Sequence, residues 1–182
     1  AGGTNTYAYV SGRPVVYTDP LGLWASQKGA YVHQRAGFLV FGSQMTGEQL
    51  SIIARAHEWV DQPDFQTAEY TFMHAMRQPD QTVDEACEQT NRYLSLVASD
   101  AISAKLAGRQ KEALFLFAVA LHTMQDSTSP SHRGFQVWSG HETGGEVAEH
   151  IRREMMYPGR GSELDVITRQ AWTAYQSGNV SG

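Results

Sequence analysis

The 182-residue chain has a single cysteine, Cys87, so it cannot form an internal disulfide. It also lacks any apolar run near the ~18 residues of a membrane-spanning helix, the longest being 113–121. A net charge of −5 and the absence of basic clusters disfavour binding to nucleic acid by phosphate neutralisation, although a bound metal can supply positive charge locally. The N-terminus has no basic region followed by an apolar stretch, so we expect no signal peptide.

The remaining composition is that of an ordinary globular domain, and helical periodicity begins at Thr46. Thr46 and Thr82 each precede a Glu or Gln by three residues, which fits a capping box. We predict helices at 46–60, 66–77, 82–106, 110–126, 145–157 and 162–176. Residues 1–30 mix β-branched and aromatic residues with Gly and Pro, which is typical of short strands and turns. The sequence therefore predicts an all-α helical bundle with a short non-helical N-terminal segment.

Histidine is unusually frequent, with seven in the chain and five after residue 60. His122 and Asp126 are four residues apart at the end of a helix that an apolar run marks as buried, so they project from one face. Ser-Thr-Ser-Pro then ends the helix, and the chain can turn back to bring His132 to the same point. Buried groups of this kind need partners, because an unpaired buried charge is costly.

His150 and Glu154 repeat the same spacing on another predicted helix. A His and a carboxylate at this spacing can bind one metal ion from a single helix. His74 lies in a third helical stretch, downstream of Asp61 and Asp64. Taken together, these side chains predict a metal site rather than separate ion pairs. We interpret His57 as lying behind the ligands or on the surface, and we leave His141 out of the ligand set.

The order and spacing of His122, Asp126, His132, His150 and Glu154 resemble the zinc-dependent phospholipase C family and the related single-strand-specific zinc nucleases. The resemblance covers roughly residues 55–155. It implies an all-α bundle that holds a cluster of zinc ions and hydrolyses phosphate esters with zinc-activated water.

The resemblance also implies roles for individual residues. Asp126 would bridge two zinc ions, one of them completed by His122, His74 and an upstream aspartate that also acts as general base. Asp61 fits that place best, and Asp64 is the alternative. Another zinc would be held by His132, His150 and Glu154. The family's remaining zinc uses an N-terminal tryptophan and a nearby histidine, for which Trp24 and His33 are the candidates. We expect Arg133, next to His132, to contact a substrate phosphate.

Residues 1–23 carry a second resemblance, to the end of the core of Rhs-repeat proteins, which are large shells that enclose a C-terminal toxin. The Asp19-Pro-Leu-Gly-Leu23 segment is similar to the motif after which such chains cleave themselves. Cleavage after Leu23 would make Trp24 the new N-terminus and would complete the remaining zinc site. The alternative is that Trp24 packs against the core and that the site holds two zinc ions.

Together these observations predict an Rhs junction at 1–23 and a helical zinc hydrolase toxin domain at 24–182, with two or three zinc ions. We expect a secreted effector delivered into a target cell, with phospholipid membrane as substrate and a cognate immunity protein and the Rhs shell as partners. A nuclease toxin on the same scaffold and a non-catalytic, zinc-stabilised binding domain are the alternatives.

Overall fold

The computed structural model describes residues 31–178, in which the regular secondary structure is helical apart from one β-bridge between Arg77 and Val137. The α-helices are α1 (Val32–Phe41), α2 (Gly47–Val60), α3 (Val83–Leu106), α4 (Gln110–Asp126), α5 (Gly144–Glu154) and α6 (Glu163–Ser177), and the longest 3-10 segment is η4 (Ala68–His74). The all-α prediction is therefore confirmed for the described residues. The strands expected within residues 1–30 lie outside them.

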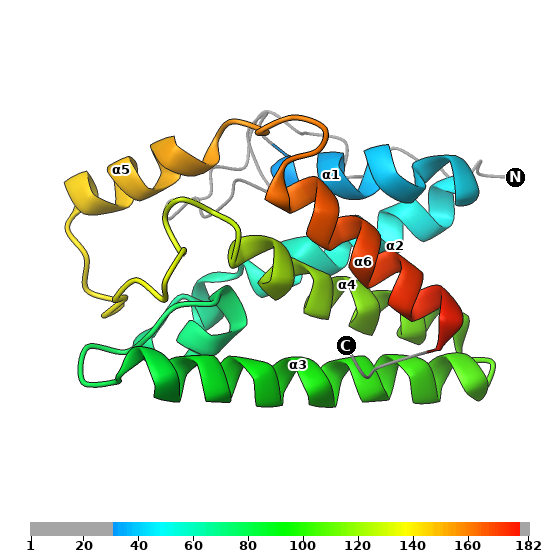
Figure 1. Cartoon of the computed structure of the whole chain (residues 1–182), viewed down its shortest axis with the longest axis horizontal. Helices are drawn as coiled ribbons and strands as arrows, with labels where there is room; N and C mark the ends of the chain where they lie inside the picture. Colours follow the sequence, from blue (N-terminus) through cyan, green and yellow to red (C-terminus); the bar gives the residue numbers. More distant parts are fainter. Residues whose placement is uncertain (1–30, 179–182) are drawn as a thin grey trace, which may run out of the picture.

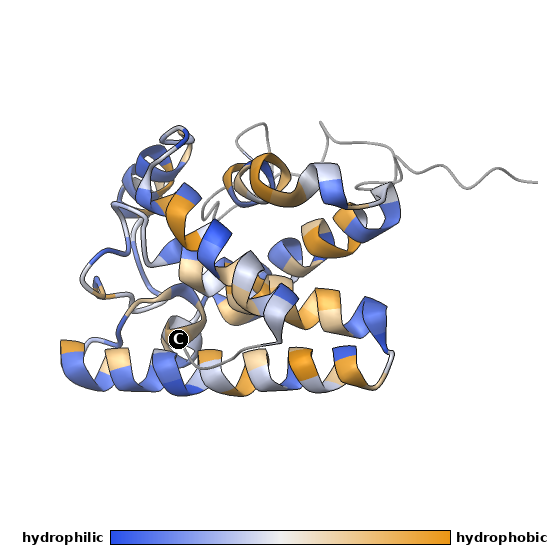
Figure 2. Ribbon diagram, turned by 45° about the vertical axis from the view of Figure 1, so that its right-hand side comes forward, coloured by the Kyte–Doolittle hydropathy of each residue, from blue (hydrophilic) through white to orange (hydrophobic). Residues whose placement is uncertain are grey.

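Helix α4 is the centre of the bundle, with α3 along one side and α2 and α6 packed on others (Figure 1). Its sequence is rich in alanine and leucine, which favour helix formation, and Ala118, Leu121 and His122 have no exposed surface. Figure 2 shows α3 alternating between hydrophobic and hydrophilic residues along its length, as expected of a helix with one side on the core. The capping boxes predicted at Thr46 and Thr82 are both present.

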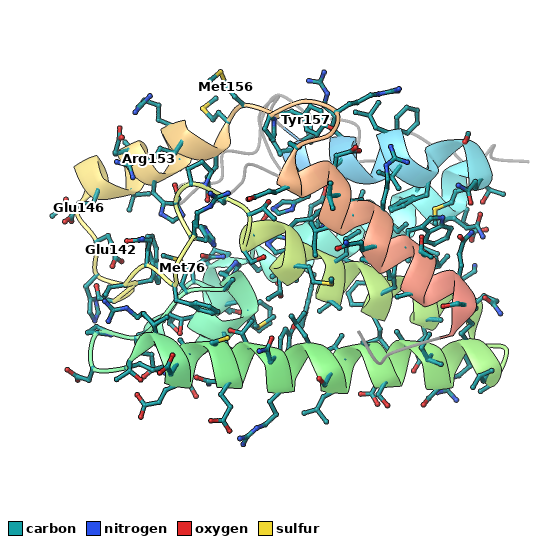
Figure 3. The ribbon with its side chains drawn as sticks, viewed as in Figure 1. Met76, Glu142, Glu146, Arg153, Met156 and Tyr157 are labelled. Carbon is teal, nitrogen blue, oxygen red and sulfur yellow. The ribbon has the colours of Figure 1, made fainter. Side chains whose placement is uncertain are left out.

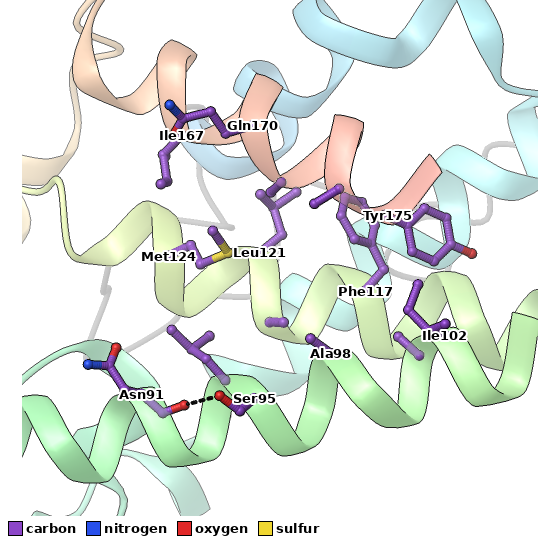
Figure 4. A pocket seen from close by; sticks show the side chains of 15 residues that line it. Asn91, Ser95, Ala98, Ile102, Phe117, Leu121, Met124, Ile167, Gln170 and Tyr175 are labelled. Atoms are coloured by element: carbon purple, nitrogen blue, oxygen red, sulfur yellow. Dashed lines mark hydrogen bonds between the residues drawn. The ribbon is translucent and has the colours of Figure 1, made fainter. Parts of the chain in front are cut away.

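Helices α3 and α6 both pack on α4 and leave a groove between them (Figure 4). The α4 side chains Phe117, Leu121 and Met124 lie at its base, while Ile102 of α3 and Ile167 of α6 contribute to its walls. The groove has a volume of about 740 Å³, and no charged residue lines it. Among the described residues, no helix combines the length and hydrophobicity needed to cross a membrane.

Replacing Leu121 with alanine tests whether α4 is the core of the bundle. Because this side chain is fully buried, we expect Leu121→Ala to lower the free energy of unfolding by about 2–5 kcal/mol. The matched control is Leu106→Ala on α3, whose side chain is 83% exposed, and it should change stability by less than about 0.5 kcal/mol. Urea unfolding followed by circular dichroism measures both. Equal effects of the two substitutions would contradict this packing.

The structure corrects two predicted boundaries and adds a helix. The stretch expected as a helix at 66–77 is the 3-10 segment η4, which ends where Ala75 adopts a left-handed conformation with φ of 51°. The helix expected to reach 157 ends at Glu154. Helix α1 was not predicted, because Tyr31 provides no side-chain cap and Gly37 and two valines lower its helix propensity. Several of its residues are buried, so contacts with the rest of the bundle stabilise this helix.

Candidate metal centre

Buried histidines and carboxylates from separate elements converge at the C-terminal end of α4. They come from α1, from α2 and the residue after it, from η4, from α4, from the loop after α4 and from α5. The set is His33, His57, Asp61, His74, His122, Asp126, His132, His150 and Glu154. All are buried except His150, whose side chain keeps 10% of its surface exposed. A cluster this dense in the interior requires a compensating positive charge.

The first group surrounds one oxygen of Asp126. His122 Nε2 lies 3.2 Å from Asp126 Oδ2 and 3.2 Å from Asp61 Oδ1, and His74 Nδ1 lies 3.1 Å from Asp126 Oδ2. His122 and Asp126 are one turn apart on α4, whereas Asp61 directly follows α2. The turn that carries His74 is fixed to α4, since Thr123 Oγ1 donates a hydrogen bond to the Met73 carbonyl.

The other oxygen of Asp126 faces α1. His33 Nε2 lies 3.3 Å from Asp126 Oδ1, so the two oxygens of this carboxylate serve different histidines. The opposite nitrogen of His33 donates to Gln125 Oε1 at 2.8 Å, and the Gln125 amide donates to Thr168 Oγ1 on α6. Because the carbonyl oxygen of Gln125 can only accept, Nδ1 of His33 carries a proton, and Nε2 is the nitrogen that faces Asp126.

A further group, called the third group here after those at the two oxygens of Asp126, consists of His132, His150 and Glu154. It joins α5 to the loop after α4. Glu154 Oε1 lies 2.8 Å from His132 Nε2 and 3.5 Å from His150 Nε2, and the two histidine nitrogens are 3.0 Å apart. His132 Nδ1 donates to the backbone carbonyl of His74. Two loop serines hold α5, since Ser129 Oγ donates to Glu154 Oε1 and Ser131 Oγ donates to the His150 carbonyl.

The pKa values show how strongly these groups interact. Burial by itself would lower the pKa of His122, but the negative charges of Asp126 and Asp61 outweigh it and raise the pKa to about 10. Burial likewise opposes the effect of Glu154 and Asp126 on His132, whose pKa rises to about 9. Despite burial, which acts in the opposite direction, the nearby histidines hold the pKa values of Asp126 and Glu154 below the usual range.

Two other histidines stay neutral. Burial lowers the pKa of His150 to about 4, and it lowers the pKa of His57 well below its usual value, reinforced by the neighbouring His33 and His122. Their nitrogens therefore keep a lone pair at neutral pH. Without a metal, protons on His122 and His132 compensate the carboxylates.

Two groups have separations between ligand atoms that fit a metal ion. One is formed by Asp61, His74, His122 and Asp126, and the other by His132, His150 and Glu154. Zinc–ligand distances of 2.0–2.2 Å in a tetrahedron place ligand atoms about 3.3 Å apart, close to the separations of 2.8–3.5 Å found here. The single N–H at Nε2 of His132 cannot donate to both Glu154 and His150. One cation between the three side chains would instead accept a lone pair from each. Among residues 31–178, three groups could each hold a metal ion: Asp61, His74 and His122; His132, His150 and Glu154; and His33, His57 and His122.

One adjustment is needed for His74 to bind a metal through Nδ1. The Gln66 side-chain nitrogen lies 3.1 Å from His74 Nε2, so in this arrangement the proton of His74 is on Nδ1. A half-turn of the Gln66 amide would place its oxygen at that position instead. His74 would then carry its proton on Nε2 and present the lone pair of Nδ1 beside Asp126.

Asp64, the alternative to Asp61, is exposed, and so is His141, which was left out of the ligand set. Arg133, expected at a substrate phosphate, has a side chain that is 62% exposed and pairs with Glu163 at the start of α6. Three other predicted residues, Asp19, Leu23 and Trp24, lie outside the described residues.

The sequence left open whether His57 lies behind the ligands or on the surface, and the structure places it behind them. It is fully buried, and its ring stacks beside His33 with ring centroids 5.2 Å apart. The signal was present in the sequence, because His57 precedes Asp61 by four residues, the same spacing as in His122 with Asp126.

Helix α5 is attached to the bundle by the third group and by a small apolar cluster, in which its Val147 and Ile151 pack with Met76 and Trp138. Val147 and Glu154 are its only buried residues, and Arg153, Glu146 and Met156 lie on its outer side and ends (Figure 3). We therefore expect chelation to speed hydrogen exchange in 144–154 by at least tenfold while α4 stays protected. Mass-spectrometric hydrogen exchange with and without a chelator measures this. Equal protection of α5 under both conditions would contradict a metal-dependent attachment.

Comparisons of the chain with protein families, with curated proteins and with solved structures found no match.

Proposed function

We propose that this chain is a zinc-dependent phosphoesterase whose metal centre is the cluster at the end of α4. The observation that supports it is the position of Asp126, whose two oxygens face separate histidine groups, as a carboxylate shared by neighbouring metal ions does. Imidazole and carboxylate ligands are those that zinc takes in catalytic sites. Asp61, His74 and His122 would hold one ion with Asp126, and His132, His150 and Glu154 another.

Zinc in these positions would act as a Lewis acid and would lower the pKa of water towards ~7. The residues of the chain would then orient the reaction. Asp61 would accept the proton of the attacking water, since its carboxylate lies beside His122 in the first group. His150 is the most exposed member of the ligand set, so a substrate would approach from the side of α5.

Phospholipids are the substrate class we propose, cleaved as in phospholipase C. The net charge of −5 and the lack of basic clusters offer little for binding a nucleic-acid backbone. Hydrolysis of a nucleic acid is therefore an outcome of the test rather than a second proposal.

The test is hydrolysis by the purified chain, with chelator treatment and zinc add-back. We expect release of phosphorylated headgroup from phosphatidylcholine vesicles, its loss after chelation and its return with zinc. Degradation of single-stranded DNA instead of lipid would move the proposal to a nuclease. Retained zinc with no hydrolysis of either substrate would overturn it in favour of a binding domain.

The sequence resemblance at residues 1–23 extends the proposal to a secreted effector released from an Rhs shell into a target cell and neutralised by an immunity protein. This extension of the proposal requires that removal of residues 1–23 changes the metal site. Chains with and without residues 1–23 should differ in zinc content and activity, and equal values would contradict release as the activating step.

A further inference from the structure

His57 contacts His122 on the side opposite the carboxylates of the candidate metal centre. Its Nδ1 lies 3.4 Å from Nδ1 of His122, and both rings are completely buried. The contact joins α2 to α4, which pack directly on each other. His57 is thus placed on the side of His122 that faces away from the carboxylates.

The ligand role of His122 determines which of its nitrogens carries a proton. Nε2 faces Asp61 and Asp126, each at 3.2 Å, so Nε2 is the atom that would bind a metal. A neutral imidazole that binds through Nε2 carries its proton on Nδ1. The side-chain partner that the structure gives to Nδ1 is His57.

Two other histidines of the site have such support. His33 is held through Gln125, and His132 donates to the carbonyl of His74. Partners of this kind fix the tautomer and the ring orientation of a metal-binding histidine. For His122 the partner is another histidine rather than a carbonyl.

We propose that His57 is a positioning residue, which accepts the Nδ1 proton of His122 and thereby aims Nε2 of His122 at the metal; this inference rests on the metal site proposed above. His57 would then carry its own proton on Nε2. That nitrogen is buried and has no hydrogen-bond partner within residues 31–178. The lone pair of His57 Nδ1 would then face the proton on Nδ1 of His122.

Direct binding of a metal by His57 is the competing role, because His33, His57 and His122 offer nitrogens within 4.8 Å of one another. The number of ions bound separates the two roles. A positioning residue changes the affinity and leaves the number at saturation unchanged, whereas loss of a ligand removes an ion.

The experiment is titration of the metal-free full chain with Co²⁺, followed by its visible absorption, for the wild type, His57→Phe and His57→Asn. Phenylalanine fills the space without an acceptor, and asparagine can place an oxygen where Nδ1 lies. We expect His57→Phe to weaken Co²⁺ binding by 10–100-fold with the same number of ions at saturation. His57→Asn should restore most of the affinity.

Unchanged affinity in His57→Phe, or one ion fewer at saturation, would overturn the positioning role. If His57→Phe does not fold, ¹⁵N spectra of the wild-type imidazoles decide, because a His122 proton on Nε2 in the metal-loaded chain would equally exclude it. A wild-type chain that binds no Co²⁺ would refute the metal site itself, and with it this inference.

Discussion

Asp126→Asn should abolish zinc binding at the group of Asp61, His74 and His122. The carboxylate faces His122 and His74 with one oxygen and His33 with the other, and an amide is a much poorer metal ligand. We expect the zinc content to fall by at least one ion per chain. Hydrolysis should drop by at least about a hundredfold, beyond the 10–100-fold typical of residues behind the ligands. Elemental analysis and initial rates, both normalised to folded protein, measure these losses.

Asp165→Asn is the matched control. Asp165 is also a buried aspartate, but it lies on α6, where it accepts from the backbone of Gly161 and pairs with Arg169. Its replacement should lower stability and leave the zinc content unchanged. If Asp126→Asn kept its full zinc content, the shared-carboxylate arrangement would be wrong.

Between about pH 6.5 and 9, the stability of the chain should fall with rising pH in the metal-free form but not in the zinc-loaded form. Without metal, the pKa values of His122 and His132 are about 10 and about 9, above the ~6.5 of an unfolded histidine. The folded state then holds protons that the unfolded state releases, so stability falls as the pH rises from ~6.5 towards 9. We expect a loss of about 2 kcal/mol or more over this range.

With zinc bound, the same histidines have no proton on the ligand nitrogen in the folded state. Below ~6.5 the unfolded chain takes up protons that the folded chain does not, so stability falls as the pH drops. Urea unfolding between about pH 6.5 and 9, with chelator or with zinc, measures both slopes. A zinc-loaded form that lost stability with rising pH as steeply as the metal-free form would show that zinc does not replace these protons.

The parts of the site that sequence patterns indicated are those that depend on local geometry. The pairs His122 with Asp126 and His150 with Glu154 lie on single helices, where a spacing of four residues determines which side chains share a face. The helices with capping boxes were predicted for the same reason, since the cap is encoded within four residues.

The parts that were missed depend on tertiary packing. Helix α1 has no side-chain cap, and its fully buried residues, Val32, His33, Ala36 and Phe41 among them, are held by contacts with other elements. His57 shares its spacing with the predicted pairs, yet only the packing of α2 on α4 shows that its ring meets His122. Likewise, the packed structure, and not the spacing, shows that Asp61 faces His122 while Asp64 is exposed.

Anomalous X-ray diffraction at the zinc edge, from crystals of the zinc-loaded chain, tests the metal centre most directly. We predict one peak between His122, His74, Asp61 and Asp126, and a second between His132, His150 and Glu154. Crystals with intact side chains at these positions but no anomalous peak among them, the imidazoles instead donating hydrogen bonds to the carboxylates, would contradict it.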